Sequence, residues 1–188
     1  RIVQIGEVKA DFDAQRVIDA TNMLAMPGLI NTHTHLSMNL FRNYADDMPL
    51  WDWLTKKIWP LEEKLTAEAV YWGSTLGIAE LIKSGVTGFL DMYFFAEETI
   101  KVVLDTGIRA YIARGLTDEE EGKEAHLEET RELYQKYHEK EGRIKIFAGP
   151  HAPYTCSPRY LEKVRALSDE LGIGIHIHLS ETQKEVDE

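Results

Sequence analysis

Two histidines with one residue between them, His33 and His35, form the sharpest chemical signal in the chain. They follow the apolar pair Leu29-Ile30, which is typical of the end of a strand. Because alternate residues of a strand point to the same face, both imidazoles can reach one metal ion. Neutral imidazole suits Zn²⁺ and Fe²⁺, and two such ligands are half of a typical site. A pair of solvent-facing loop histidines explains this short motif equally well.

The same spacing returns near the other end of the sequence, where His176 and His178 share a face and Glu181 follows three residues later. A histidine at a strand end can supply a third ligand. A carboxylate one turn further on can reach water or substrate and carry a proton to a leaving group or ring nitrogen. The alternative is a buried imidazole pair followed by a glutamate that stabilises a helix start. Together with the first pair, the metal site is the stronger interpretation.

Two more polar side chains follow predicted strands. His151 lies in a loop between two prolines, which restrict the backbone and direct the imidazole over the strand ends. It is suited to bind substrate, and the alternative is a hydrogen-bonded loop histidine. Arg114 is suited to a carboxylate or another polar group of a substrate. An ion pair with a neighbour such as Asp118 or Glu119 explains Arg114 equally well.

The segment Pro49–Glu63 is rich in tryptophan and leucine and is long for a connection between a strand and a helix. It is suited to form an aromatic wall for a flat ligand, with Glu62 projecting toward that ligand. Plain helix packing is the alternative, and it is the favoured interpretation for Trp51 and Trp59.

These side chains need a scaffold, and the sequence predicts one by alternating short apolar runs with segments of helical periodicity. Such alternation is typical of a parallel sheet covered by helices, in which functional residues collect at the carboxyl ends of the strands. Five of the seven histidines fall at or just after a predicted strand end. The predicted strands are Leu29–Thr32, Val86–Asp91, Ile108–Ala113, Ile144–Gly149 and Ile173–His178.

Helices are expected over Thr66–Ser84, Glu97–Thr106 and about Lys123–Lys140, and a fourth is expected from the N-cap Ser157 to Gly172. The first of them carries an apolar face formed by Ala69, Trp72, Leu76, Ala79 and Ile82.

Residues 1–26 do not fit this alternation. Short strands are expected at Arg1–Ile5 and Val17–Ala20, around a polar turn, so these residues are expected to be the remnant of a small β-domain. The α/β part then covers residues 27–188.

Composition excludes several classes of partner. The chain has 188 residues, a formal net charge of −11 and 44% hydrophobic residues, which is ordinary for a soluble globular protein. The negative charge argues against nucleic acid and anionic membranes, and no apolar stretch reaches the roughly 18 residues of a membrane helix. A single cysteine, Cys156, favours a reducing compartment and hence the cytoplasm. The chain starts at Arg1 and ends in mid-pattern at Glu188, so we expect it to be part of a longer protein.

Together these motifs resemble the amidohydrolase superfamily. The resemblance rests on Pro27–His35, the strand that ends in Asp91, Gly149–His151 and His178–Glu181. Within the superfamily the chain looks most like the 5-methylthioadenosine/S-adenosylhomocysteine deaminases and their chlorohydrolase and guanine-deaminase relatives. The resemblance implies an α/β fold, a TIM-type (β/α)₈ barrel beside a small β-sandwich. A barrel usually needs about 250 residues, so this chain would supply an N-terminal fragment with the first five β/α units.

The resemblance also implies the metal chemistry. It makes His33, His35 and His178 the metal ligands and Glu181 the proton shuttle. The cofactor would be one divalent ion, zinc, with iron as the alternative. A single metal is favoured because the fourth strand ends in Gly149-Pro150-His151, where two-metal relatives carry a bridging lysine.

The residues that would bind substrate follow from the same resemblance. Glu62 would bind ribose hydroxyls, Arg114 and His151 would contact the substrate, and Trp53 would line an apolar pocket. The expected partner is a small molecule, with no nucleic acid and no membrane.

The implied reaction is hydrolytic deamination of an adenosine-type molecule such as 5-methylthioadenosine or S-adenosylhomocysteine, with Glu181 protonating a ring nitrogen and ammonia leaving. A triazine chlorohydrolase or a guanine deaminase is the alternative within the superfamily, and a non-catalytic fragment is the alternative outside it. The superfamily takes a further histidine and an aspartate from later strands, so the 188-residue chain by itself is predicted to be inactive. Unpaired sheet edges would favour a homo-oligomer or another association through the exposed barrel edges.

Overall fold

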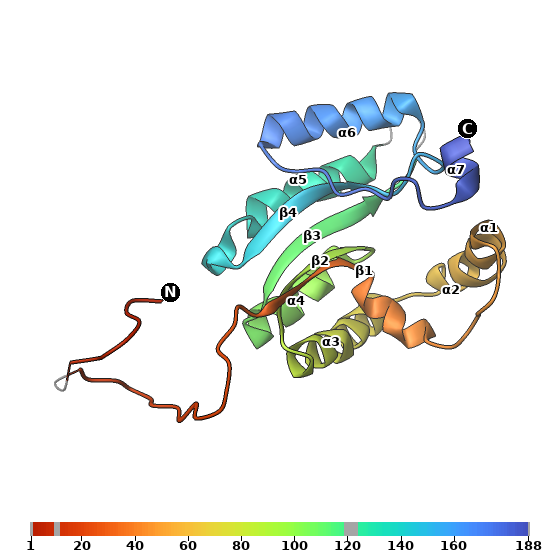
Figure 1. Cartoon of the computed structure of the whole chain (residues 1–188). Coiled ribbons are helices and arrows are strands. Elements are labelled where there is room, and N and C mark those ends of the chain that lie inside the picture. Colours follow the sequence, from red (N-terminus) through yellow and green to blue (C-terminus); the bar gives the residue numbers. More distant parts are fainter. Residues whose placement is uncertain (1, 10–11, 119–123, 188) are drawn as a thin grey trace.

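The structure, a computed structural model, describes residues 2–9, 12–118 and 124–187. Its centre is a four-stranded parallel sheet in which the strands lie in chain order, β1-β2-β3-β4 (Figure 1). The strands are β1 (Leu29–Thr34), β2 (Val86–Tyr93), β3 (Arg109–Leu116) and β4 (Ile144–Pro150). The first four predicted strands are therefore confirmed, each with a longer carboxyl end than expected.

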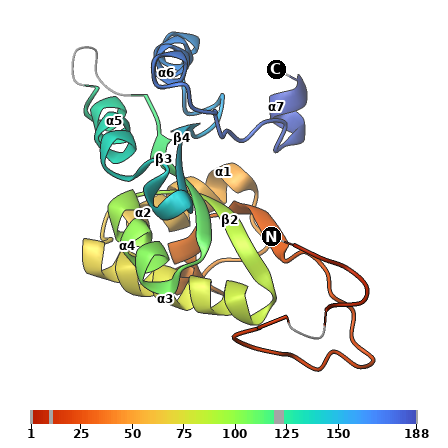
Figure 2. The ribbon, with the colours of Figure 1, turned by 90° about the vertical axis from the view of Figure 1, so that its left-hand side faces the viewer.

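Long helices follow the strands and lie around the outside of the curved sheet (Figure 2). They are α3 (Ala67–Lys83), α4 (Ala96–Thr106), α5 (Ala125–Tyr137) and α6 (Pro158–Leu171). The predicted start of the third helix, Lys123, lies outside the described residues. Shorter elements are the 3₁₀ segments η1 (Leu36–Phe41) and η3 (Lys140–Gly142), α1 (Leu50–Trp53), the π-helical η2 (Leu54–Ile58), α2 (Trp59–Glu62) and α7 (Gln183–Asp187). This is the expected partial (β/α)₈ barrel.

The core lies between the sheet and these helices, where burial of apolar side chains stabilises the fold. Phe89, Ile112 and Ile146 from the strands pack against Ile100 and Val103 of α4, all of them inaccessible to solvent. Within the described part of the chain, no helix is both long enough and apolar enough to cross a membrane.

Helix ends follow the expected capping chemistry. The hydroxyl of Thr66 accepts the amide of Ala69 at 3.2 Å, and Ser157 caps α6 in the same way. Gly107 and Gly172 end α4 and α6 with φ of 77° and 64°, a left-handed conformation that suits glycine.

The apolar face that the sequence indicates for α3 is not the face that packs. Trp72 and Leu76 are 59% and 46% exposed, whereas Gly73 and Gly77 are buried. The reason is a close approach of η1, which the small glycines permit: a Cβ at Gly73 would lie 2.9 Å from the carbonyl oxygen of Ser37. A helical pattern of large hydrophobic residues identifies the face that carries them. It does not identify a face on which glycines allow another segment to pack closely.

The fifth predicted strand, Ile173–His178, is reduced to a single parallel bridge between Ile175 and Ala148. Its backbone still runs beside β4, because the Ala148 amide donates to Gly174 and the His176 amide donates to Ala148. In the described part of residues 27–188, the structure therefore shows four strands and one bridged segment where the sequence predicts five strands.

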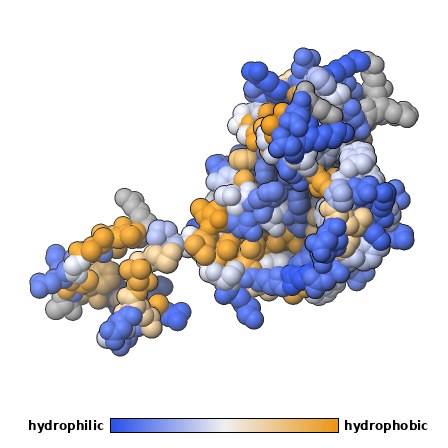
Figure 3. Space-filling view, turned by 45° about the vertical axis from the view of Figure 1, so that its right-hand side comes forward, coloured by the Kyte–Doolittle hydropathy of each residue, from blue (hydrophilic) through white to orange (hydrophobic). Residues whose placement is uncertain are grey.

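The N-terminal strands are also not formed. Residues 2–9 and 12–28 contain no helix or strand, and Arg1 lies outside the described residues. Figure 3 shows this segment beside the packed part of the molecule, with apolar side chains on its surface. Val3, Ile5, Val17 and Leu24 are each at least 80% exposed. These hydrophobic side chains are therefore not packed against other described residues, and the assignment of residues 1–26 to a small β-domain stays a prediction.

Candidate metal centre

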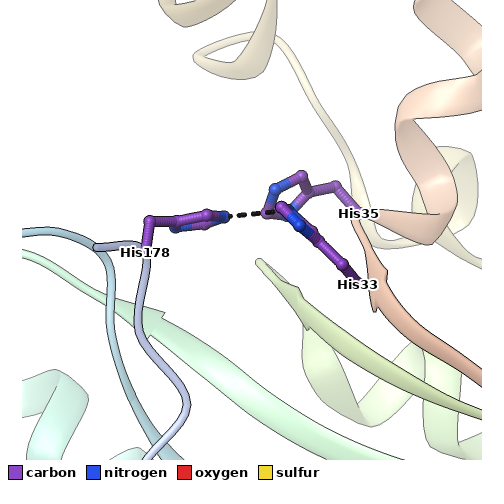
Figure 4. A group of neighbouring side chains, drawn as sticks. All are labelled: His33, His35 and His178. Atoms are coloured by element: carbon purple, nitrogen blue, oxygen red, sulfur yellow. Dashed lines mark hydrogen bonds between the residues drawn. The ribbon is translucent and has the colours of Figure 1, made fainter. Parts of the chain in front are cut away.

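Three imidazoles from opposite ends of the chain meet at the carboxyl end of the sheet (Figure 4). His33 and His35 stand at the end of β1, and His178 follows the segment that bridges to β4. One nitrogen atom of each ring lies within 4.8 Å of those of the other two, and the Nε2 atoms of His33 and His178 are 3.2 Å apart. Across residues 2–9, 12–118 and 124–187, this is the one group of three metal-binding side chains that could share an ion.

Two of the rings are fixed by backbone carbonyl groups. His35 donates its Nδ1–H to the carbonyl oxygen of Met92 at 2.7 Å, and His178 donates its Nδ1–H to that of His151 at 2.8 Å. This arrangement places the proton on Nδ1 and leaves the Nε2 lone pair for a metal. Burial lowers the pKa of His35, which favours the neutral form that a metal needs. The set therefore fits a divalent ion.

The pairing of β1 with β2 is irregular around His33. Asn31 pairs with Phe89 and Thr34 pairs with Asp91, so three steps along β1 oppose two steps along β2. Such a bulge re-aims a side chain that regular pleating would send elsewhere. The Asn31 side chain accepts the His33 amide at 3.1 Å and supports this turn.

A cavity of about 100 Å³ lies next to His35. His151 lines it, and burial lowers the pKa of that imidazole to about 4. Glu62 lines it from α2 and accepts the hydroxyl of Tyr93 at 2.8 Å. Burial raises the pKa of Glu62, while the Tyr93 hydroxyl opposes that shift. The cavity therefore combines an uncharged imidazole with a carboxylate that can accept hydroxyl groups.

Glu181 is exposed but anchored. The Tyr154 hydroxyl donates to its Oε2 atom at 2.8 Å. The amides of Ser180 and Glu181 donate to the carboxylate of Glu185 at 2.8 and 3.0 Å, and Ser180 has a left-handed φ of 56°. The loop after His178 therefore holds this carboxylate through its side chain and through its backbone.

Two of the residues expected to bind substrate are engaged elsewhere. Arg114 is 9% exposed and donates from Nε to Glu129 of α5 at 2.8 Å, which is a different ion pair from the predicted ones. Glu119 lies outside the described residues. The Trp53 indole donates to the carbonyl oxygen of Ala45 at 3.1 Å.

Two other tryptophans line the cavities. Trp59, for which the sequence favours packing, lines the cavity beside His35. Trp59 and Trp51 also line a groove of about 550 Å³ together with Phe94 and Tyr154. The side chain of Trp51 is more than half exposed, although its ring contacts Trp59.

Sequence reasoning assigned no role to Met92, Tyr93 or Tyr154, which hold His35, Glu62 and Glu181. The signal that could have found them is position. Met92 and Tyr93 are at the carboxyl end of β2, and Tyr154 is in the loop after β4, where parallel folds place their chemistry.

Comparison with known proteins places this geometry in a family. The Amidohydrolase family matches residues 24–188. The chain is 55% identical over 190 residues to the 5-methylthioadenosine/S-adenosylhomocysteine deaminase of Thermoanaerobacter pseudethanolicus, and 56% identical over 190 residues to that of Caldanaerobacter subterraneus subsp. tengcongensis. Each match covers 100% of this chain and 44% of the relative, so the chain spans less than half the length of these relatives.

A solved structure agrees with the sequence matches. An adenosine deaminase from Xanthomonas campestris with bound zinc superposes with a TM-score of 0.80 and 37% identity. That match covers 86% of this chain and 38% of the other. Because the family matches most of its length, the chain belongs to the amidohydrolase family.

Proposed function

We propose that the protein containing this chain is a metal-dependent hydrolytic deaminase of adenosine-type small molecules, with 5-methylthioadenosine and S-adenosylhomocysteine as substrates. The observation that carries the proposal is the cluster of His33, His35 and His178 at the strand ends, beside a cavity that holds Glu62. The names of relatives at 55% and 56% identity support the choice of substrate. The formal charge of −11 and the single cysteine support a small-molecule substrate and the cytoplasm.

The three imidazoles would hold one divalent ion. Zinc is the proposed metal because imidazole nitrogen suits it and because the similar adenosine deaminase binds zinc; iron is the alternative. When bound, such an ion supplies Lewis-acid activation of water. The carbonyl groups of Met92 and His151 prepare two of the ligands by fixing their tautomers.

Glu181 is the proposed proton carrier. A glutamate three residues after His178 is suited to take a proton from water and deliver it to a ring nitrogen of the substrate. The bond from Tyr154 orients one carboxylate oxygen and leaves the other available for that transfer.

The cavity residues bind the substrate in this proposal. Glu62 accepts hydroxyl groups of the ribose, and His151, neutral through burial, donates to or accepts from a polar group of the substrate. Arg114 and Trp53 stay candidates for substrate contacts. Arg114 would have to exchange its ion pair with Glu129 for a substrate group.

Release of ammonia from 5-methylthioadenosine by the purified, zinc-loaded protein tests the proposal. Replacement of Glu181 by glutamine should lower kcat by about 10²- to 10⁴-fold, since the amide cannot carry the proton. No turnover of any adenosine derivative would contradict the proposed function. Turnover of guanine or of a chlorinated triazine in its place would favour the other amidohydrolase activities.

We also propose that the 188-residue chain has no deaminase activity by itself. Leu29 and Ile30 of β1 are 51% and 65% exposed, and β1 pairs with β2 alone among the described strands. This edge and the edge beyond the bridged segment are suited to association, either with further barrel strands or with a second copy. Supplying the remaining 56% of the Thermoanaerobacter relative in trans should restore ammonia release. Strong activity of the isolated chain would contradict this proposal, and size-exclusion chromatography would detect a homo-oligomer.

A further inference from the structure

A buried carboxylate lies against the strand that carries the first two histidines. Asp91 is 1% exposed and stands in β2 opposite Thr34 of β1. Its Oδ1 atom accepts the backbone amide of Leu36 at 2.6 Å. Burial of a carboxylate is costly unless its hydrogen bonds repay the loss of water. The amide it binds belongs to the residue directly after His35.

The next residue of β2 holds the same histidine by its ring. Met92 accepts the Nδ1–H of His35 through its carbonyl oxygen at 2.7 Å. Two consecutive residues of one strand therefore act on His35, the first through the backbone that follows it and the second through the imidazole. A shift of the backbone after His35 would change the distance between the His35 ring and the Met92 carbonyl oxygen.

The other side of this backbone is closed by α3. A Cβ at Gly73 would lie 2.9 Å from the Ser37 carbonyl oxygen, and the side chain of Asn39 donates to the Gly73 carbonyl oxygen at 3.0 Å. The segment η1 thus fits tightly between α3 and the end of β2. Loss of the Asp91 bond would free the end of η1 nearest to His35, while the contacts with α3 would hold the remainder.

We propose that Asp91 is a positioning residue for His35: its bond to the Leu36 amide holds the backbone so that the His35 ring can donate Nδ1–H to Met92 and present Nε2 to a metal. The role needs an acceptor at Oδ1 and does not need a negative charge. It rests on the proposed metal centre for its consequence, but the orientation of the ring can be measured without metal.

Four variants of the 188-residue chain separate this role from general stability. Asp91→Asn keeps an acceptor at the same place. Asp91→Ala removes it, and Asp91→Ser shortens the side chain by one bond so that it no longer reaches Leu36. Thr99→Ala is the matched control, because Thr99 is equally buried and bonds to Ser74 at 2.9 Å in the core away from the histidines.

Zinc affinity, measured by competition with a chelator at a temperature where each variant is folded, is the first readout. Removal of the groups that orient a ligand typically costs about 10- to 100-fold in metal affinity. We expect that loss in Asp91→Ala and Asp91→Ser, and zinc binding close to that of the unmodified chain in Asp91→Asn and Thr99→Ala. Unchanged affinity in Asp91→Ala, or an equal loss in Asp91→Asn, would overturn the positioning role.

The second readout is the tautomer of His35 without metal, from long-range ¹H–¹⁵N correlation of the imidazole. The unmodified chain and Asp91→Asn should show the proton on Nδ1, and Asp91→Ala and Asp91→Ser should show a mixture of tautomers. An Nδ1–H tautomer in every variant would overturn the proposal. If the unmodified chain binds no zinc, the proposed metal centre fails, and the tautomers still decide the role of Asp91.

Discussion

The two halves of the metal centre are built differently. On one side, His33 and His35 end a strand that is paired with β2. The Met92 carbonyl oxygen accepts the His35 ring, and Asp91 accepts the amide that follows His35. On the other side, His178 follows a segment joined to β4 by one bridge. Both the amide and the ring of His178 donate to one acceptor, the carbonyl oxygen of His151, at 3.0 and 2.8 Å.

This difference teaches where the site is already formed and where it depends on its neighbours. The half at β1 is a product of the sheet, because paired strands place its histidines before any ligand binds. The half at His178 is held by hydrogen bonds to the loop after β4. Its neighbours Ile175 and Leu179 are 44% and 63% exposed. A metal that joins the two halves should therefore change the second far more than the first.

Removing a ligand from either half should have the largest effect. Metal sites of four ligands contribute about 10–16 kcal/mol, or roughly 3 kcal/mol for each ligand, so His35→Ala and His178→Ala should each weaken zinc binding by about 100-fold or more. Chelator competition measures this. His138→Ala, which removes an imidazole bonded to the backbone of β4, should leave the affinity unchanged. An unchanged zinc affinity in His178→Ala would show that His178 takes no part in metal binding.

Zinc itself should tell the two halves apart. Zinc at about 100 times its Kd can stabilise a folded region by up to about 2.7 kcal/mol. We expect amide hydrogen exchange between residues 174 and 178 to slow by a large part of the corresponding 100-fold. Amides of β1 should slow less, since ladder bonds already protect them. Equal protection in both segments would contradict the expectation that zinc orders the half at His178 more than the half at β1.

Much of this scaffold follows from sequence, and the two halves show why some of it does not. The runs that became β2, β3 and β4 are mostly apolar and mostly buried, so the local pattern is enough to predict them as strands. The run at Ile173–His178 carries isoleucine at every second position, yet the structure gives it one bridge. The number of ladder bonds that an edge segment forms depends on the strands beside it, and a local pattern does not contain that information.

The candidate site could also be predicted from the sequence only in part. The positions of the histidines at predicted strand ends predicted that His33 and His35 lie near the pair His176 and His178, because strand ends converge at one edge of a parallel sheet. The choice of His178 came from the family resemblance, and the structure brings it together with His33 and His35. Their role as ligands stays a prediction. The acceptors that orient them are carbonyl groups of Met92 and His151, and every residue has a carbonyl group. The residue types in the sequence therefore do not indicate which carbonyl groups orient the histidines.

A pair of strand glycines tests how firmly the loop after β4 is held. At Gly149 a Cβ would lie 2.6 Å from the Arg114 carbonyl oxygen, so Gly149→Ala should force β3 and β4 apart just before His151. Overpacking of this kind costs about 1–3 kcal/mol. At Gly88 the nearest atom is 3.5 Å away, and Gly88→Ala should cost nothing or stabilise by up to about 1 kcal/mol.

Urea unfolding measures both changes. We further expect Gly149→Ala to weaken zinc binding, because the carbonyl group of His151 positions His178. Equal stability of the two variants would show that β4 adjusts freely and that the second half is less dependent on it than we infer.

The smallest expected effect comes from two tyrosines that stand in equivalent roles on the two halves. Tyr93 at the end of β2 donates to Glu62, and Tyr154 after β4 donates to Glu181, both at 2.8 Å. A hydrogen bond to a charged group contributes about 1.5–3 kcal/mol when buried and less when exposed. In the whole protein that contains this chain, each phenylalanine variant should therefore change one kinetic constant by roughly 10-fold. Tyr93→Phe leaves Glu62 less well oriented toward ribose and should raise KM. Tyr154→Phe leaves Glu181 unguided and should lower kcat, because the proton transfer then begins from fewer productive positions of the carboxylate. If both variants change KM alone, Tyr154 supports substrate binding as Tyr93 does. That result would contradict the expectation that Tyr93 and Glu62 serve binding while Tyr154 and Glu181 serve proton transfer.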